Sequence, residues 1–159
     1  MNINKKLLDL ALEGKQVARL KGGDPFLFGR GGEELELLAE QGIPFEIVPG
    51  ITSALAVPAY AGIPVTHRDF SSSVHIITGH KKDIDKPQID FEALVKLDGT
   101  LVFLMGVGAL QYICQSLIKA GMPSSMPAAI LENGTKACQH RVVSTLQRLP
   151  EEARQQGIS

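Results

Sequence analysis

Tryptophan is absent from this sequence of 159 residues, cysteine occurs only twice, and the formal net charge is only -1. The cysteines, Cys114 and Cys138, stand in dissimilar contexts with no histidines at ligand spacing nearby, so we expect free thiols and no metal site. A near-neutral chain lacks the basic field that nucleic-acid binding requires. No apolar run approaches the ~20 residues of a membrane span and no secretory signal is evident, which predicts a cytoplasmic protein without a membrane partner.

Glycine is concentrated in one stretch, residues 21–34, which reads Lys-Gly-Gly-Asp-Pro-Phe-Leu-Phe-Gly-Arg-Gly-Gly-Glu-Glu. The apolar run Val17–Leu20 before it predicts a short buried strand, and apolar residues at helical spacing predict a helix from about Gly32 to Gln41. Strand, loop and helix in this order are typical of a parallel α/β unit. Because ligands bind beyond the carboxyl ends of such strands, the loop is a candidate binding site.

The residue types in this loop are suited to holding a ligand against the main chain. Gly22 and Gly23 lack a Cβ, which permits close approach to backbone amides, and Asp24 beside a proline ring offers a fixed acceptor. A tight turn would explain two adjacent glycines on its own. The second glycine cluster, Arg30 between the clusters and the acid pair that follows exceed what a plain turn needs, so a ligand site is favoured.

The patterning elsewhere predicts two α/β domains, residues 1–66 and 74–159, joined by a turn-rich linker at 67–73. In the first domain we expect an amphipathic helix at Ile3–Leu12, a strand at Ile43–Val48, and a helix to about Ala61 that Thr52 or Ser53 caps, unless these hydroxyls bind a ligand instead. In the second domain we expect strands at 74–79, 100–105, 127–132 and 141–146 and helices at 91–97, 109–120 and 149–159.

The second domain offers weaker chemical signals. Gly106-Val107-Gly108 follows a strand, as in a dinucleotide loop, but the third glycine of that fingerprint would fall at Gln111. Basic side chains gather at Arg68 and at His80–Lys82. They are consistent with an ordinary solvated surface or with a polycarboxylate ligand, since an arginine fork matches a carboxylate in a bidentate way.

Taken together, these motifs resemble a known family. The loop at 21–34, followed by Val48–Ala54 and Ala61–Arg68, is similar to the tetrapyrrole methylases, and the run Phe26–Glu34 is most like the uroporphyrinogen-III C-methyltransferases among them. The resemblance covers nearly the whole chain and implies two α/β domains with S-adenosylmethionine in the cleft between them. It further implies a homodimeric enzyme that methylates pyrrole carbons of uroporphyrinogen III without a metal, giving precorrin-2 for sirohaem and cobalamin.

The resemblance also implies roles for individual residues. Family members carry an N-terminal strand and a Gly-Pro-Gly-Asp loop before this point, with the aspartate and lysine thought to handle protons, and a further strand after the position of Ser159. We therefore expect an internal fragment without catalytic residues of its own. Arg30 and Arg68 are the expected substrate contacts, and the expected cofactor contacts are Gly22, Gly23, Asp24, Leu27, Thr52, Ser53, Met105, Ala129 and Gly134.

Two other functions remain open from the sequence. A dinucleotide-binding oxidoreductase would use the glycine loops for a pyrophosphate, although the broken fingerprint argues against it. A truncated domain without catalysis would expose sheet edges and apolar surface, and would therefore self-associate.

Overall fold

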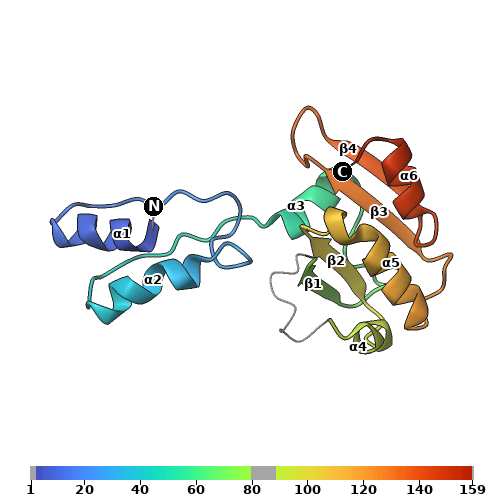
Figure 1. Cartoon of the computed structure of the whole chain (residues 1–159), viewed down its shortest axis with the longest axis horizontal. Coiled ribbons are helices and arrows are strands. Elements are labelled where there is room, and N and C mark those ends of the chain that lie inside the picture. The colour runs from blue at the N-terminus through green and yellow to red at the C-terminus, as the bar shows by residue number, and fades with distance from the viewer. Residues whose placement is uncertain (1–2, 80–88, 159) are drawn as a thin grey trace. The chain divides into compact units, whose positions relative to one another are not determined.

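A computed structural model describes residues 3–79 and 89–158, so the basic stretch His80–Lys82 lies outside the described residues. The chain divides into two compact units, Met1–Thr52 and Ser53–Ser159. The predicted linker at 67–73 thus falls within the second unit, and the domain boundary predicted there stays a prediction. The helices and strands of both units are labelled in Figure 1.

The first unit contains two helices, α1 (Ile3–Leu12) and α2 (Gly31–Glu40), which pack side by side. Both were predicted from helical spacing of apolar residues. The Asn4 side chain donates a hydrogen bond of 2.8 Å to the Glu33 carbonyl, which ties the start of α1 to the first turn of α2. The described part of this unit is therefore a helix pair with long connecting loops.

The strands predicted at Val17–Leu20 and Ile43–Val48 were wrong, because neither segment takes strand conformation. A strand exists only when its backbone groups pair with a neighbouring strand. No described segment of the first unit pairs with either one. Their apolar side chains are correspondingly open to solvent, with Leu20 85% and Val48 76% exposed.

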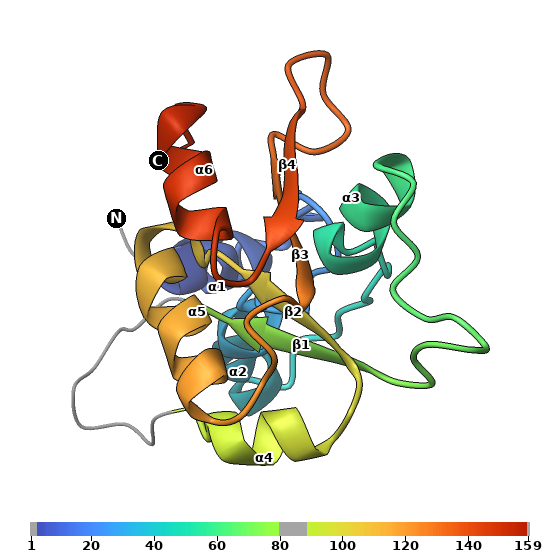
Figure 2. The same cartoon turned by 90° about the vertical axis from the view of Figure 1, so that its right-hand side faces the viewer.

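The second unit contains a parallel pair and an antiparallel pair of strands (Figure 2). β1 (Val74–Thr78) runs parallel to β2 (Thr100–Leu104), and α4 (Phe91–Lys96) lies between them in sequence. β3 (Pro127–Glu132) and β4 (His140–Thr145) form the predicted hairpin. The remaining elements are α3 (Ser53–Tyr60), η1 (Val107–Ala109), α5 (Leu110–Lys119) and α6 (Leu149–Gln155). Every strand and helix predicted for residues 74–159 is therefore confirmed to within a few residues, over the part of this range that the structure describes.

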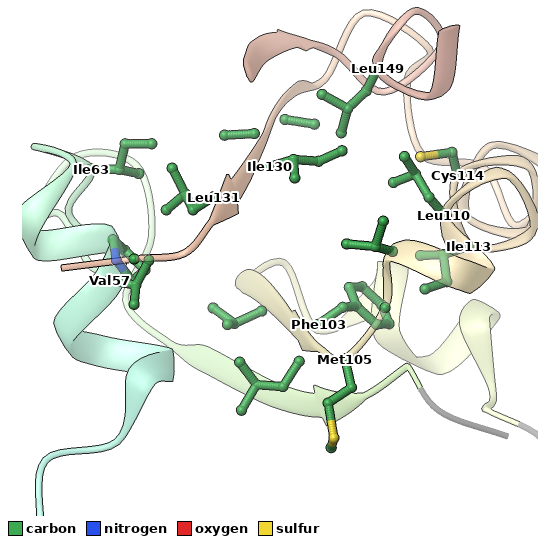
Figure 3. A pocket seen from close by; sticks show the side chains of 18 of the residues that line it. Val57, Ile63, Phe103, Met105, Leu110, Ile113, Cys114, Ile130, Leu131 and Leu149 are labelled. Carbon is green, nitrogen blue, oxygen red and sulfur yellow. The ribbon is translucent and has the colours of Figure 1, made fainter. Parts of the chain in front are cut away.

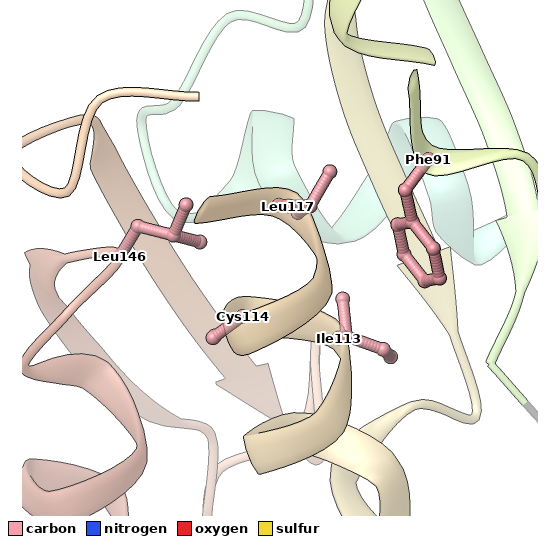
Figure 4. Close-up of a cluster of buried hydrophobic side chains, with 5 residues drawn as sticks. All are labelled: Phe91, Ile113, Cys114, Leu117 and Leu146. Carbon is pink, nitrogen blue, oxygen red and sulfur yellow. The ribbon is translucent and has the colours of Figure 1, made fainter. Parts of the chain in front are cut away.

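The core of the second unit forms around α5. Ile113, Cys114 and Leu117 recur at the spacing that keeps side chains on one helical face, and all three are buried. They pack with Phe91, the first residue of α4, and with Leu146, which directly follows β4 (Figure 4). Cys114 is a free thiol, as predicted, and its burial raises the pKa of that thiol.

A second buried cluster joins the hairpin to the last helix. Its members are apolar side chains of β3, β4, α6 and the residues that follow α6: Ile130, Val142, Leu149, Ala153 and Ile158. Because α5 contributes to both clusters through Leu110, the hairpin and the parallel pair share one continuous packing arrangement. No helix in the described part of the chain has the length and apolar character needed to cross a membrane.

Candidate functional site

In the first unit, Asp24 organises the glycine-rich loop through its own carboxylate. Oδ1 accepts hydrogen bonds of 2.9 Å from the amides of both Phe26 and Leu27, and Oδ2 lies 3.5 Å from the Gly50 amide. The amide of Leu27, followed by that of Phe26, holds the pKa of Asp24 below its ordinary value. The carboxylate therefore shapes the loop from within, a role that comes in addition to the ligand contact expected from the sequence.

Two loops of this unit cross backbone to backbone at Gly23 and Gly50. A Cβ on Gly50 would lie 2.8 Å from the carbonyl carbon of Gly23, closer than a real side chain could approach. Gly23 has a φ of +76°, and a Cβ there would lie 3.9 Å from the Cα of Thr52. The first unit thus gathers the predicted contacts Gly22, Gly23, Asp24, Leu27 and Thr52 around one crossing of the chain.

Glu34 anchors the base of the glycine-rich loop in a way that sequence reasoning missed. Its carboxylate, only 11% exposed, receives Arg19 Nη2 on one oxygen and Lys21 Nζ on the other, each at 3.0 Å. Burial alone would raise the pKa of Glu34, but the bonds from Lys21 and Arg19 outweigh it and lower that pKa. The sequence showed two acidic residues in the first turn of α2. It did not show the partners of Glu34, because Lys21 and Arg19 lie 13 and 15 residues earlier.

The predicted substrate arginines are both at the surface. Arg30 precedes α2 with a φ of +60°, and its side chain, 70% exposed, lies 3.7 Å from the Glu33 carboxylate. Arg68 lies in an exposed part of the second unit. Each guanidinium is accessible to a carboxylate ligand, and the structure gives no geometry that relates the two.

The second unit contains a cavity of about 470 Å³ (Figure 3). Its walls come from α3, the end of β2, one face of α5, the start of α6, and β3 with the loop that follows it. Most lining side chains are aliphatic or aromatic. Four of the predicted cofactor contacts, from three separate parts of the sequence, line this cavity: Ser53, Met105, Ala129 and Gly134.

Met105 marks the strand end beside this cavity with an unusual backbone. Its φ of +56° lies in the left-handed region, which is uncommon for a bulky residue. The residue is 61% exposed. Met105 therefore lies at the surface and not in the apolar core.

No group of three or more histidine, cysteine, aspartate or glutamate side chains in residues 3–79 and 89–158 could hold a metal ion. What the described residues offer instead is a hydrogen-bonded glycine loop in one unit and an apolar hollow in the other. A cavity with mostly apolar walls suits a small organic ligand.

Comparison with known proteins supplies the remaining evidence. The family model for tetrapyrrole (corrin/porphyrin) methylases matches residues 1–150. The porphyrin biosynthesis protein HemD of Ruminiclostridium josui is 58% identical over 98% of this chain, and an Escherichia coli sirohaem synthase is 54% identical over 96%. The chain spans about a third of the length of these curated relatives, 31% and 33% respectively.

Solved structures agree with this relationship. Uroporphyrin-III C-methyltransferase from Thermus thermophilus, in complex with S-adenosyl homocysteine, matches with a TM-score of 0.79 and 36% identity, over 94% of this chain and 65% of that one. A cobalt precorrin-4 methyltransferase of cobalamin biosynthesis matches with a TM-score of 0.87 and 28% identity, over 99% of this chain and 67% of that one. The α/β fold class predicted from the sequence is confirmed.

Proposed function

Because this chain belongs to the tetrapyrrole methylase family, we propose that it forms part of an S-adenosylmethionine-dependent uroporphyrinogen-III C-methyltransferase. The product would be precorrin-2, a precursor of sirohaem and cobalamin. The observation that carries the proposal is the set of four predicted cofactor contacts lining one apolar cavity. Activity is proposed for the whole protein, since the chain spans only about a third of its curated relatives.

The described residues of each unit offer features that suit such a cofactor. The cavity of about 470 Å³ is within the ~300–1,000 Å³ typical of small-molecule sites. In the second unit, Ala129 and the backbone at Gly134 would offer a flat wall for a purine. In the first unit, amides around Gly22 and Gly23 can donate to a carboxylate or ribose. When bound, S-adenosylmethionine supplies a methyl group activated by a sulfonium sulfur.

The chain's own contribution to the reaction is binding and orientation. Holding two reactants at near-attack distance can supply about 7–11 kcal/mol of barrier reduction, so a site without a catalytic base of its own still contributes. Arg30 and Arg68 would bind carboxylates of the tetrapyrrole through their planar forks. We assign no proton-transfer residue to this chain. The homodimer and the cytoplasmic location stay predictions.

Titration calorimetry with S-adenosylhomocysteine, with NADH as the control ligand, tests the proposal. Saturable binding of S-adenosylhomocysteine alone is the expected result. Binding of NADH alone would replace the proposal with the dinucleotide-binding oxidoreductase. If neither ligand gives a heat of binding, this chain does not bind the cofactor on its own, and only the family relationship stands.

A further inference from the structure

Helix α3, one wall of the cavity, depends on outside contacts for its position. It has eight residues and contains Pro58, which lacks a backbone N–H donor. Helices this short are not stable on their own in water. The position of α3 therefore depends on the residues that its buried face contacts.

The first such contact is made by Gly134, in the loop between β3 and β4. A Cβ on Gly134 would lie 2.8 Å from the Cβ of Val57 and closer still to both of its methyl groups. The φ of Gly134 lies outside the left-handed region, so the backbone itself would accept alanine. Glycine is required at this position for space, and Val57 already fills that space.

The second contact lies just beyond the C-terminal end of α3. Arg141, on β4, donates a hydrogen bond of 3.0 Å from Nη1 to the carbonyl of Ala61, just after the helix. Carbonyls at a helix C-terminus lack partners within the helix, and a cation there also meets the negative end of the helix dipole. The hairpin thus holds α3 at two points, Val57 by packing and Ala61 by a charged hydrogen bond.

We propose that Gly134 is a positioning residue that seats α3 and thereby fixes Ser53 at the cavity. Ser53 and Val57 are four residues apart, so they share one face of the helix, and both line the cavity. The proposal rests on the proposed function, because the ligand of that cavity is taken to be S-adenosylmethionine. It differs from a direct role for Gly134, in which the missing side chain makes room for the ligand itself.

A double-mutant cycle separates these two roles. Gly134→Ala should weaken S-adenosylhomocysteine binding about tenfold, because the added methyl group pushes Val57 and α3 outward. Adding Val57→Ala should restore affinity to within about threefold of Val57→Ala alone, since the contacting methyl groups are gone. If Gly134 contacts the ligand directly, the second substitution should restore nothing, and the proposal is overturned.

Hydrogen exchange of the α3 amides supplies a readout that needs no ligand. Gly134→Ala should speed exchange in α3, and the double variant should slow it again. Gly108→Ala is the matched control, because a Cβ there meets nothing within 4 Å, and it should change neither affinity nor exchange.

The two experiments distinguish failure of the inference from failure of the proposed function. If the parent chain binds S-adenosylhomocysteine but Gly134→Ala has no effect, the inference fails and the function stands. If the parent chain binds nothing, the proposed cofactor site fails, while exchange in α3 still decides whether Gly134 seats the helix. Unchanged exchange in Gly134→Ala would overturn the seating itself.

Discussion

The two units are held together by different kinds of interaction. Among the described residues of the first unit, Leu38 is the only hydrophobic side chain that is buried, and the loop there is fixed by Asp24 and Glu34. The second unit buries apolar side chains around α5 and between the hairpin and α6. The comparison teaches that the glycine loop depends on charge and hydrogen bonding, whereas the cavity depends on packing.

The largest expected effect tests the packing of the second unit. Leu117→Ala should lower the free energy of unfolding of that unit by about 2–5 kcal/mol, because Leu117 is only 3% exposed and its removal leaves a void. Urea unfolding followed by circular dichroism measures the change. Leu20→Ala, at a residue 85% exposed in the first unit, is the control and should change stability by less than about 0.5 kcal/mol. Equal losses would contradict the contrast between the units.

A smaller effect is expected in the first unit from Glu34→Gln. Loss of the carboxylate leaves Arg19 and Lys21 without their shared acceptor, at a cost of about 1–3 kcal/mol. The lower part of that range is expected because the Arg19 side chain is 39% exposed and thus partly screened. Limited proteolysis within residues 21–30 would report the loosened loop. Glu33→Gln, at a side chain 55% exposed, should leave the cleavage rate unchanged; an equal increase there would show that Glu34 has no special role.

The smallest effects concern pH, and they have opposite signs in the two units. The folded pKa values of Asp24 and Glu34 are lowered, so their contribution is complete above the ordinary carboxyl pKa and is lost as pH falls through the folded values. The folded pKa of Cys114 is raised, so its contribution is present below the ordinary thiol pKa and is lost as pH rises through the folded value. Amide exchange measured in each unit from acid to alkaline pH checks this. Acid loosening of the second unit before the first would contradict it.

Much of the second unit could be predicted from the sequence because its signals are local. The apolar spacing of α5 and the turn between β3 and β4 are contained within short windows, and both elements form as predicted. The strands predicted at Val17–Leu20 and Ile43–Val48 failed for the opposite reason. Apolar composition shows that a segment suits a strand, whereas pairing depends on another segment.

The candidate site shows the same limit. Its glycines and Asp24 could be recognised from a motif, but the hydrogen bonds that occupy the Asp24 carboxylate could not. Contacts between distant residues, such as Glu34 with Arg19 and Gly134 with Val57, have no sequence signature because either partner alone looks ordinary. Only the structure distinguishes the residues that hold the loop in place from those that line the cavity.

The contrast between the two cysteines has a practical consequence. Cys114 is buried within the α5 core and its thiol is disfavoured from ionising, while Cys138 is exposed in the loop that carries Gly134. A thiol-reactive fluorophore should therefore label the unaltered protein at Cys138 alone. Its emission would follow that loop during ligand titration, with no engineered attachment point.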